Sequence, residues 1–475
     1  MKHFVAYLVI VLVAFSSSAT TVWTLQNKEY NIDTINHIVV GPSTTLTSLR
    51  LTGAQNLNIF YTVTDLTNPI LDIRTLKAKN TIYARQEVSG MALDHDNDST
   101  QYFLGVNADF FNMRKGNSIG SHVINSQPIY VDNNGRTQWT WSKNRQPIMD
   151  EITITHNVIM NNSSILLSGI NTTASKNSIT LYTPLYGAKT DSVATATEVV
   201  ISPIDLPVTI GKTSKMIVTS TPKTGGVTSL TPNSYVLSGT DFQGILISRL
   251  KQGDVIEISS TASLSNGAPI TPTELISGYP VILQNGVTTN PVDILHHLND
   301  LHPRTAIGSD ESNSKLIILI VDGRSKDSDG CTSKVLADIM RYVGCYNAMN
   351  FDGGGSSELY IKNLGICNVP SDGKERTVAN GLYVVAKVPT DNEISSIAFA
   401  QSRTAIKKGD IYTPIIYGYN KHGVLINTNV DGVELSFPKK FGKVKGNSLI
   451  AEKCGENTLT AHFGKLSTST QILVE

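Results

Sequence analysis

Residues 316–357 read LIILIVDGRSKDSDGCTSKVLADIMRYVGCYNAMNFDGGGSS, and this stretch decides the fold. The unbroken apolar run at 316–321 predicts a strand that is buried on both faces. Apolar residues then recur at helical spacing over 332–343, and Gly344 follows as a stop signal, so this segment predicts a helix. The short apolar run at 348–351 predicts a second buried strand.

The order of these segments predicts where their loops lie. A right-handed crossover through the helix would make the two strands parallel. The Asp322-Gly323-Arg324 loop and the turn that begins at Asp352 would then lie at the same end of the sheet. Because loops at the carboxyl ends of parallel strands commonly bind ligands, we expect a functional site at this end.

Most of the remaining chain reads as short strands separated by turns. Alternation of apolar and polar residues at 152–155, 178–182 and 255–258 predicts half-buried strands. This β-rich pattern does not suit a doubly wound fold. We therefore predict an α+β fold, with a mixed β-sheet and few helices, for a catalytic domain over residues 20–388.

The C-terminal part of the chain has a different pattern. A boundary is predicted near 388–392, and residues 391–475 contain short strands, turns and an alternating segment at 466–474. This part resembles bacterial Ig-like domains, whose final element is matched by Ala451, Gly455, Leu459, Thr460 and Ala461. The resemblance implies a small all-β sandwich that acts as a spacer or adhesion module, without a catalytic role.

The N-terminus has the layout of a secretory signal peptide, which we place at residues 1–19. Lys2 precedes an apolar stretch at 4–15, and Ser17-Ser18-Ala19 offers small residues at the cleavage point. The apolar stretch is short for a membrane span, which disfavours the alternative of an uncleaved anchor. No later segment is apolar for long enough to predict a membrane-spanning helix. We expect a bacterial protein that is secreted, periplasmic or at the cell surface.

Composition excludes some classes of function. The formal net charge is 0 and charged residues make up 16% of the chain, which argues against a nucleic-acid binder. The four cysteines match no zinc site; a bridge among Cys331, Cys345 and Cys367 and free thiols are equally good readings. The acidic loop at 94–98 lacks the glycine and the distal glutamate of a calcium loop. We predict no metal and no cofactor.

The Asp352 turn has the residues of a reaction centre. Gly353, Gly354 and Gly355 allow backbone conformations that are closed to other residues. Consecutive N–H groups in such a turn can form a concave nest for an anion. Ser356 and Ser357 add hydroxyl groups, but the lysine of a nucleotide-binding P-loop is missing. A tight structural hairpin is the alternative reading.

Other charged motifs could complete this site. Arg304, Arg324 and Arg376 could each hold a phosphate through two hydrogen bonds, and His302 could transfer protons near neutral pH. Carboxylates at Asp109, Asp322 and Asp352 would suit glycosidic cleavage. Asn107 and Asp109 alternate at a predicted strand end and so would face the same way, although a strand-terminal cap explains them equally well.

A series of motifs occurs in the order found in one family. They are N-x-D-F-F at 107–111, L-Y-T-P at 181–184, V-L-S-G at 236–239, G-x-P at 278–280, H-P-R-T-A-I-G at 302–308, V-D-G-R at 321–324, F-D-G-G-G-S-S at 351–357 and E-R-x-V-x-N at 375–380. From about residue 30 to 387 the chain resembles the phosphodiester glycosidase family, to which the lysosomal uncovering enzyme, N-acetylglucosamine-1-phosphodiester alpha-N-acetylglucosaminidase, belongs. Phe351 departs mildly from the leucine that is common in the family.

The resemblance implies an exported glycosidase that hydrolyses a sugar-1-phosphodiester to a free sugar and a phosphomonoester. Its substrate would be a carbohydrate phosphodiester, such as a glycan linked through N-acetylglucosamine-1-phosphate. The catalytic candidates are Asp352, Asp322, Asp109 and His302. The substrate-binding candidates are Arg304, Arg324, Arg376, Gly353, Gly354, Gly355, Ser356, Ser357, Asn107 and Asn380. The alternatives are a phosphodiesterase or glycosidase of different specificity on the same scaffold, and a non-catalytic glycan-binding surface protein.

Overall fold

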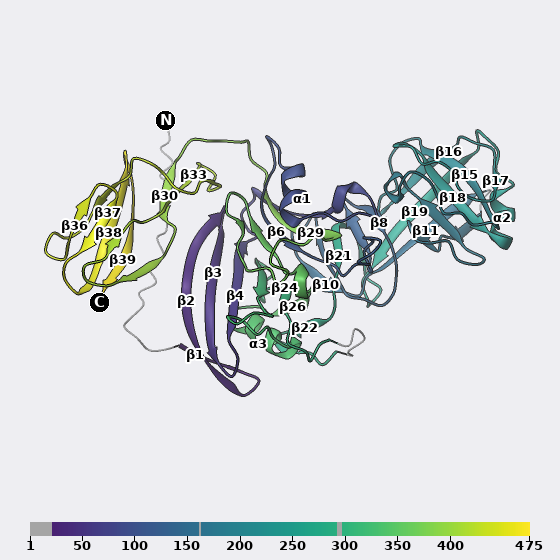
Figure 1. The fold of residues 1–475 in the computed structure, drawn as a ribbon. Helices are drawn as coiled ribbons and strands as arrows, with labels where there is room; N and C mark the ends of the chain where they lie inside the picture. The colour runs from purple at the N-terminus through teal and green to yellow at the C-terminus, as the bar shows by residue number, and fades with distance from the viewer. Residues whose placement is uncertain (1–20, 161–162, 292–296) are drawn as a thin grey trace.

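The computed structural model describes residues 21–160, 163–291 and 297–475. The protein is elongated, with the C-terminal domain at one end, a central core, and a lobe of teal strands at the other end (Figure 1). The predicted signal peptide lies outside the described residues. Within the described ranges, no helix is both long and apolar enough to cross a membrane.

A nine-stranded sheet forms one layer of the core. Its order is β1 (Thr21–Leu25), β2 (Lys28–Gly41), β3 (Thr44–Gly53), β4 (Leu57–Asp65), β25 (Lys315–Val321), β24 (Arg304–Ser309), β26 (Asn347–Asn350), β22 (Val281–Gln284) and β23 (Val287–Thr288). Ile317, Leu319 and Val321 pack on the side of helix α3 (Ser333–Tyr342). The alternate residues of β25 pack into a second cluster on the other face. The 316–321 segment is therefore a strand buried on both faces, as predicted.

Strands β25 and β26, which helix α3 connects, are parallel to each other, as predicted. Both strands run antiparallel to β24, which lies between them, so they are parallel to each other but not adjacent. Helix α3 is capped by Thr332, whose hydroxyl accepts a hydrogen bond from the Val335 N–H at 3.3 Å. The loops after β25 and β26 therefore lie at one edge, together with the first residue of β24.

A five-stranded sheet packs over the inner face of the nine-stranded one. Its order is β28 (Gly365–Ile366), β27 (Leu359–Ile361), β6 (Gln101–Asn107), β29 (Asn380–Ala386) and β5 (Leu71–Lys77). Helix α1 (Val88–His95) covers the outer face of this sheet, with β6 and β29 beneath it. Leu359 pairs with Val106, which brings the end of β6 beside the residues that follow the Asp352 turn.

Residues 153–270 form a lobe with its own hydrophobic core. The described strands of its sheet are β11 (Thr153–Met160), β12 (Ser163–Leu166), β13 (Gly169–Ile170), β14 (Ile179–Tyr182), β15 (Ala196–Pro203), β16 (Lys212–Val218), β17 (Lys223–Thr224), β18 (Tyr235–Thr240), β19 (Val255–Ser263) and β20 (Pro269–Ile270). The parallel ladder between β13 and β14 makes this sheet mixed. Helix α2 (Asp241–Ile247) contacts β18 and β15.

A small sheet joins the lobe to the core. It contains β10 (Ile148–Asp150), β9 (Gln138–Ser142), β21 (Pro272–Ser277), β7 (His122–Ile124) and β8 (Gln127–Tyr130). Two short 3-10 helices, η1 (Ala78–Asn80) and η2 (Pro184–Tyr186), lie near this junction. The region predicted as one domain is thus a two-layer core with an inserted lobe.

The C-terminal strands form a separate β-sandwich around their own core. They are β30 (Ser396–Phe399), β31 (Arg403–Ile406), β32 (Ile411–Tyr412), β33 (Ile416–Tyr419), β34 (Leu425–Asn427), β35 (Glu434–Ser436), β36 (Gly442–Lys445), β37 (Ser448–Ala451), β38 (Gly455–Phe463) and β39 (Leu466–Val474). The Tyr419 hydroxyl donates to the Val39 carbonyl at 2.8 Å and ties the sandwich to β2. The α+β class with an added sandwich is confirmed; the Ig-like assignment stays a prediction.

Candidate active site

The Asp352 turn is held between the two sheets of the core. The Asp352 N–H donates to the Ala108 carbonyl at 2.8 Å, and the Asn107 side chain donates to the Asp352 carbonyl at 2.6 Å. A 3-10 turn, η3 (Gly354–Ser356), follows. The Gly354 N–H donates to the Pro303 carbonyl at 2.9 Å, next to the start of β24. The end of β6 and the start of β24 thus fix the position of Asp352.

The predicted anion nest is only partly available. The N–H groups of Gly354, Ser356 and Ser357 donate to the carbonyls of Pro303, Gly353 and Gly354. These donors are used within the turn, so they cannot all face a ligand. The positive charge at this site must come from side chains.

Two arginine side chains supply that charge. Gly354 has a φ of +62°, and a Cβ atom there would lie 3.1 Å from Nη2 of Arg324. A Cβ atom on Gly355 would overlap the guanidinium of Arg376. The absence of side chains at these two glycines lets both guanidinium groups lie against the turn.

Arg376 is oriented by neighbouring side chains. Its Nε and Nη2 atoms each lie 2.7 Å from Oδ2 of Asp372, and Nη1 donates to the Ser356 hydroxyl at 3.3 Å. Its backbone N–H donates to a carboxyl oxygen of Glu358. The guanidinium is therefore fixed next to the turn while part of its surface stays exposed.

The carboxyl group of Asp352 has an altered proton affinity. Burial raises its pKa to about 6. The Ser356 hydroxyl and the Arg376 guanidinium oppose this rise, and the nearby Asp109 carboxylate adds to it. Asp352 itself keeps part of its surface exposed. It is therefore a carboxyl group that changes charge in the mildly acidic range.

Asp109 lies close enough to Asp352 to affect its charge. It is 2% exposed, and its two carboxylate oxygens accept from the Gly120 N–H at 2.8 Å and from Nη2 of Arg136 at 3.0 Å. Burial raises its pKa to about 6, and Arg136 opposes the rise. The structure thus brings together Asp109 and Asp352, two of the predicted carboxylates.

His302 contacts the same group of residues. Its Nδ1 atom lies 3.2 Å from Nη2 of Arg324. Because a guanidinium can only donate, Nδ1 accepts and Nε2 carries the proton in the neutral ring. Burial, followed by the charges of Arg304 and Arg324, lowers the pKa of His302. At neutral pH it is therefore an uncharged ring with an N–H at Nε2.

Arg304 lies near His302, but its side chain is buried. It is 1% exposed; Nε donates to the Cys331 carbonyl at 2.9 Å, and Nη2 donates to the carbonyls of His297 and Asp300 at 2.8 Å each. These bonds use its guanidinium to hold residues 297–300 near Cys331, which lies two residues before α3. This placement does not favour the prediction that Arg304 binds phosphate, because the side chain is buried and main-chain oxygens accept from its Nε and Nη2 atoms.

Asp322 also faces another part of the protein. Its carboxylate accepts from Nδ2 of Asn368 at 3.0 Å and from the Val369 N–H at 3.1 Å. Burial raises its pKa to about 6. Asp322 therefore anchors the loop that leads to Asp372 and Arg376.

Three further predicted residues are buried supports. Asn107 accepts from the Thr305 hydroxyl at 3.0 Å and from the Glu358 N–H at 3.2 Å. Asn380 accepts from the Asp109 N–H and donates to Ser118 Oγ, both at 2.8 Å. The hydroxyl oxygens of Ser357 and Thr305 lie 3.1 Å apart. Their polar atoms position Asp352 and Asp109 through protein contacts.

Three neighbours of the site, Arg136, Asp372 and Glu358, were not predicted. Arg136 holds Asp109, and its guanidinium lies 5.1 Å from the centre of the partly exposed Phe110 ring. Asp372 orients Arg376, and its spacing of four residues was a usable signal. Glu358 directly follows the quoted serine pair. Arg136 is separated from every motif, so the sequence offered no signal for it.

Glu358 is a buried carboxyl group behind Arg376. Among the described residues its Oε2 atom has no hydrogen-bond partner, while Oε1 accepts from the Arg376 N–H. Burial is the main cause that raises its pKa to about 9. Glu358 is therefore protonated at neutral pH and supports the Arg376 main chain.

Replacing Glu358 by glutamine should flatten the pH dependence of stability. Between about pH 5 and 9 the folded state keeps a proton that the unfolded chain releases, so this group's contribution to stability is lost as the pH rises. Calorimetric Tm values across this range should fall less steeply for Glu358→Gln than for the wild type. The exposed Glu311→Gln serves as the control and should keep the wild-type slope. Equal slopes for Glu358→Gln and wild type would contradict the assignment.

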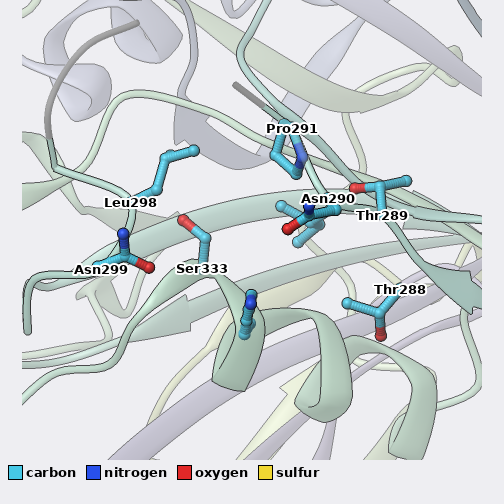
Figure 2. A pocket seen from close by; sticks show the side chains of 9 residues that line it. Thr288, Thr289, Asn290, Pro291, Leu298, Asn299 and Ser333 are labelled. Atoms are coloured by element: carbon cyan, nitrogen blue, oxygen red, sulfur yellow. The ribbon is translucent and has the colours of Figure 1, made fainter. Parts of the chain in front are cut away.

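A cavity of about 150 Å³ lies apart from the Asp352 turn. In Figure 2 Ser333, at the start of α3, lies between Leu298 and Asn299 on one side and Thr288–Pro291 on the other. None of the predicted site residues lines it. The candidate active site is the surface around Asp352, Arg324 and Arg376.

The comparison with known families agrees with the motifs at this surface. Residues 209–385 match the phosphodiester glycosidase family. The matched range includes Asp322, Arg324, Asp352 and Arg376. Asp109 lies before this range in the sequence, two residues after the end of β6.

Known proteins share the fold or a short segment. A prophage-derived protein of Bacillus subtilis, YomE, is 44% identical over 87 residues, which cover 18% of this chain and only 13% of that protein. A Synechocystis structure has a TM-score of 0.57 at 16% identity and covers 72% of this chain and 62% of its own. A Burkholderia pseudomallei protein whose name describes it as exported has a TM-score of 0.55 at 16% identity, covering 70% and 74%.

The catalytic domain of zebrafish N-acetylglucosamine-1-phosphodiester alpha-N-acetylglucosaminidase, auto-inhibited by its pro-peptide, is a weaker match. Its TM-score is 0.39 at 14% identity, with 75% of this chain and 87% of that chain covered. This value carries no argument about individual residues. The likeness to the phosphodiester glycosidase family therefore rests on the match over residues 209–385, and the roles of individual residues rest on their geometry.

Proposed function

We propose that this protein hydrolyses a sugar-1-phosphodiester at the Asp352 turn and releases a free sugar and a phosphomonoester. The observation that carries the proposal is the placement of the Asp352 carboxyl group, on a partly exposed residue, beside two guanidinium groups. The family match supports the same reaction class. A substrate with a glycosidic carbon next to a phosphate needs both kinds of group.

The phosphate would lie against Arg324 and Arg376. Both guanidinium groups flank the glycine turn, and the Ser356 hydroxyl lies beside Arg376. Guanidinium groups suit phosphate oxygens because they offer parallel N–H donors. Arg304 is left out of this set, since it is buried and its Nε and Nη2 atoms donate to main-chain carbonyls.

Asp352 would act on the sugar carbon through water. The bond between C1 and the bridging oxygen breaks, and its electron pair leaves with the phosphate, where the arginines stabilise the added charge. A water oxygen bonds to C1, and the Asp352 carboxylate accepts a proton from that water. The Nε2–H of His302 would donate to an oxygen of the departing phosphate.

Asp109 would assist as the charge partner of Asp352. Its oxygens are bonded to Gly120 and Arg136 and it is almost fully buried, so it does not need to touch the substrate. Its negative charge helps to raise the pKa of Asp352. A carboxylate with a raised pKa binds a proton more strongly than an ordinary carboxylate. It is therefore the better proton acceptor, provided that the pH is high enough to keep it ionised.

Replacing Ser356 by alanine should shift the pH profile of activity. Asp352 must be ionised to accept a proton, so kcat/KM should rise with pH through about 6. The Ser356 hydroxyl stabilises the ionised form, and Ser356→Ala should therefore move this limb upward by about 0.5 to 1 pH unit. Ser357→Ala, which loses a contact to Thr305, is the matched control and should leave the limb in place. No shift in the Ser356 variant would argue against Asp352 as the base.

The direct test of the reaction is to identify its products. Purified protein is incubated with N-acetylglucosamine-1-phosphate esterified to a simple alcohol, and the products are followed by phosphorus NMR. We expect the alcohol's phosphomonoester and free sugar. Sugar phosphate plus free alcohol would identify a phosphodiesterase instead, and binding without turnover would favour a glycan-binding protein.

We also propose that the protein acts outside the cytoplasm. The support is the signal-peptide pattern at residues 1–19, together with the shared fold of the Burkholderia protein whose name describes it as exported. Detection of the full-length gene product in the culture medium or cell-envelope fraction would test this point.

A further inference from the structure

A second cavity, of about 460 Å³, is strongly cationic. Lysines and arginines predominate among the residues that line it, which are Lys79, Thr81, Tyr83, Ala84, Arg85, Arg114, Lys115 and Thr377. The described lining contains no acidic residue. The four cationic side chains are exposed, and none of them forms a salt bridge within the described ranges. We name this hollow the cationic cavity.

A buried lysine connects the segments that form the cationic cavity. The buried Lys77 donates from Nζ to the carbonyls of Ala84 at 3.0 Å, Gly116 at 3.2 Å and Ala379 at 2.8 Å. A Cβ atom on Gly116 would lie 2.9 Å from Ala84, so the two loops are in close contact. One buried ammonium group thus fixes the three segments that carry the lining residues.

The lobe supports a third side of the cavity. The Ile82 N–H donates to the Leu185 carbonyl at 2.8 Å, and the Tyr83 hydroxyl donates to that of Tyr186 at 3.1 Å. The ring of Tyr83 meets Tyr186 edge-on at 5.3 Å and is 39% exposed. An exposed aromatic face next to hydroxyl groups is suited to the face of a sugar ring.

The cationic cavity is connected to the candidate active site on two sides. Thr377 directly follows Arg376. Arg114 and Lys115 form the tip of a hairpin whose base is Asp109, as the bonds from Gly116 N–H to Asn112 and from Ile119 N–H to Phe110 indicate. Five residues span at most roughly 16 Å, and residues 113–115 form a turn, so the tip of the hairpin lies within this distance of Asp109. A linear substrate held at Arg376 can therefore continue into the cavity.

We propose that the cationic cavity binds a further phosphodiester group of the same substrate chain, so that the substrate is a repeating sugar-phosphate polymer. This inference rests on the proposed function for the position of the cleaved bond. Lys79, Arg85, Arg114 and Lys115 would neutralise the phosphate, while Tyr83, Thr81 and Thr377 would contact the sugar. Four unpaired cations are in excess for a neutral glycan but match a chain that carries a negative charge in each repeat.

Chain length is the variable that tests the proposal. Synthetic chains of one and four N-acetylglucosamine-phosphate repeats are compared as substrates. In the wild type the four-repeat chain should have a kcat/KM about 10-fold higher per cleavable end, and added salt should remove the advantage. The variant Lys79→Ala/Arg85→Ala/Arg114→Ala/Lys115→Ala should lose this advantage through KM while hydrolysing the one-repeat substrate normally.

A matched control removes the same charge elsewhere. Lys212, Lys251, Lys439 and Lys445 are exposed, and their fourfold replacement by alanine should keep the chain-length advantage. The proposal is overturned if the wild type treats both substrates alike, or if the two fourfold variants lose the advantage equally. Circular dichroism and one-repeat turnover report whether the cavity variant is folded.

A binding experiment tests this proposal independently of the proposed function. Calorimetric titration of Asp352→Asn with the four-repeat chain, and with a thymidine tetranucleotide as a charged comparison, needs no turnover. If the glycan chain binds, and binding is lost when the four cationic side chains are replaced, the proposal for the cavity is supported. This holds even if the wild type hydrolyses neither substrate, because the lack of hydrolysis would refute only the proposed reaction. Equal binding of the tetranucleotide would overturn the assignment to sugar phosphates.

Discussion

Asp352→Asn should lower kcat for a sugar-1-phosphodiester by about 1,000-fold or more, because an amide cannot accept the proton of the attacking water. The fold should be kept, since the main-chain bonds to Ala108 and Asn107 do not involve the carboxylate. Replacing a carboxyl group whose pKa burial raises to about 6 by a neutral amide should also leave Tm at neutral pH unchanged or higher. Single-turnover kinetics and calorimetry would measure both effects.

Asp322→Asn is the matched control for this variant. Asp322 is also buried at the end of a strand in the same sheet, and its pKa is also raised to about 6. Its carboxylate accepts from Asn368 and Val369, and an asparagine oxygen can accept in its place. We expect a loss of less than about 10-fold. Normal turnover in Asp352→Asn, or an equal loss in both variants, would refute the central role of Asp352.

Arg376→Ala should lower kcat/KM for the phosphodiester by about 100- to 1,000-fold, because a guanidinium that stabilises the departing phosphate is lost. Arg376→Lys should not restore activity. A lysine ammonium cannot reach Asp372 through two nitrogens and Ser356 through a third, as the arginine does. Steady-state kinetics of both variants would test this expectation.

Arg341→Ala provides the control for Arg376. Arg341 also pairs with a nearby aspartate, Asp338, at 2.7 Å, but it lies on helix α3. Its removal should leave kcat/KM unchanged. A further comparison uses an aryl N-acetylglucosaminide that lacks phosphate: any activity on it should be far less sensitive to Arg376 than activity on the phosphodiester. Equal sensitivity would show that Arg376 does not act on phosphate.

Local patterns predicted the frame of the site. The apolar run at 316–321, the helical spacing after it and the second apolar run were sufficient to predict two parallel strands with their loops at one edge. Gly353, Gly354 and Gly355 were sufficient to predict a turn whose backbone other groups could approach closely. These features depend on residues that are neighbours in the sequence.

Long-range contacts account for the differences. Arg304 belongs to a motif beside the turn, yet its side chain bonds to the segment 297–300 and to Cys331. Arg136 reaches Asp109 from a distant hairpin, and no pattern near either residue indicates the pair. The anion nest is only partly available for a local reason, since the N–H groups of Gly354, Ser356 and Ser357 donate to nearby carbonyls. The inserted lobe was not predicted because its strands alternate as those of the core do.

The measurement that most directly tests the account is hydrolysis of the N-acetylglucosamine-1-phosphodiester in water enriched in oxygen-18. Cleavage between C1 and the bridging oxygen places the label on the sugar, so the wild type should give labelled sugar and an unlabelled phosphomonoester, and Asp352→Asn should give neither. Label in the phosphate would mean attack at phosphorus, and it would contradict the assignment of Asp352 to the sugar carbon and of the two arginines to the departing group.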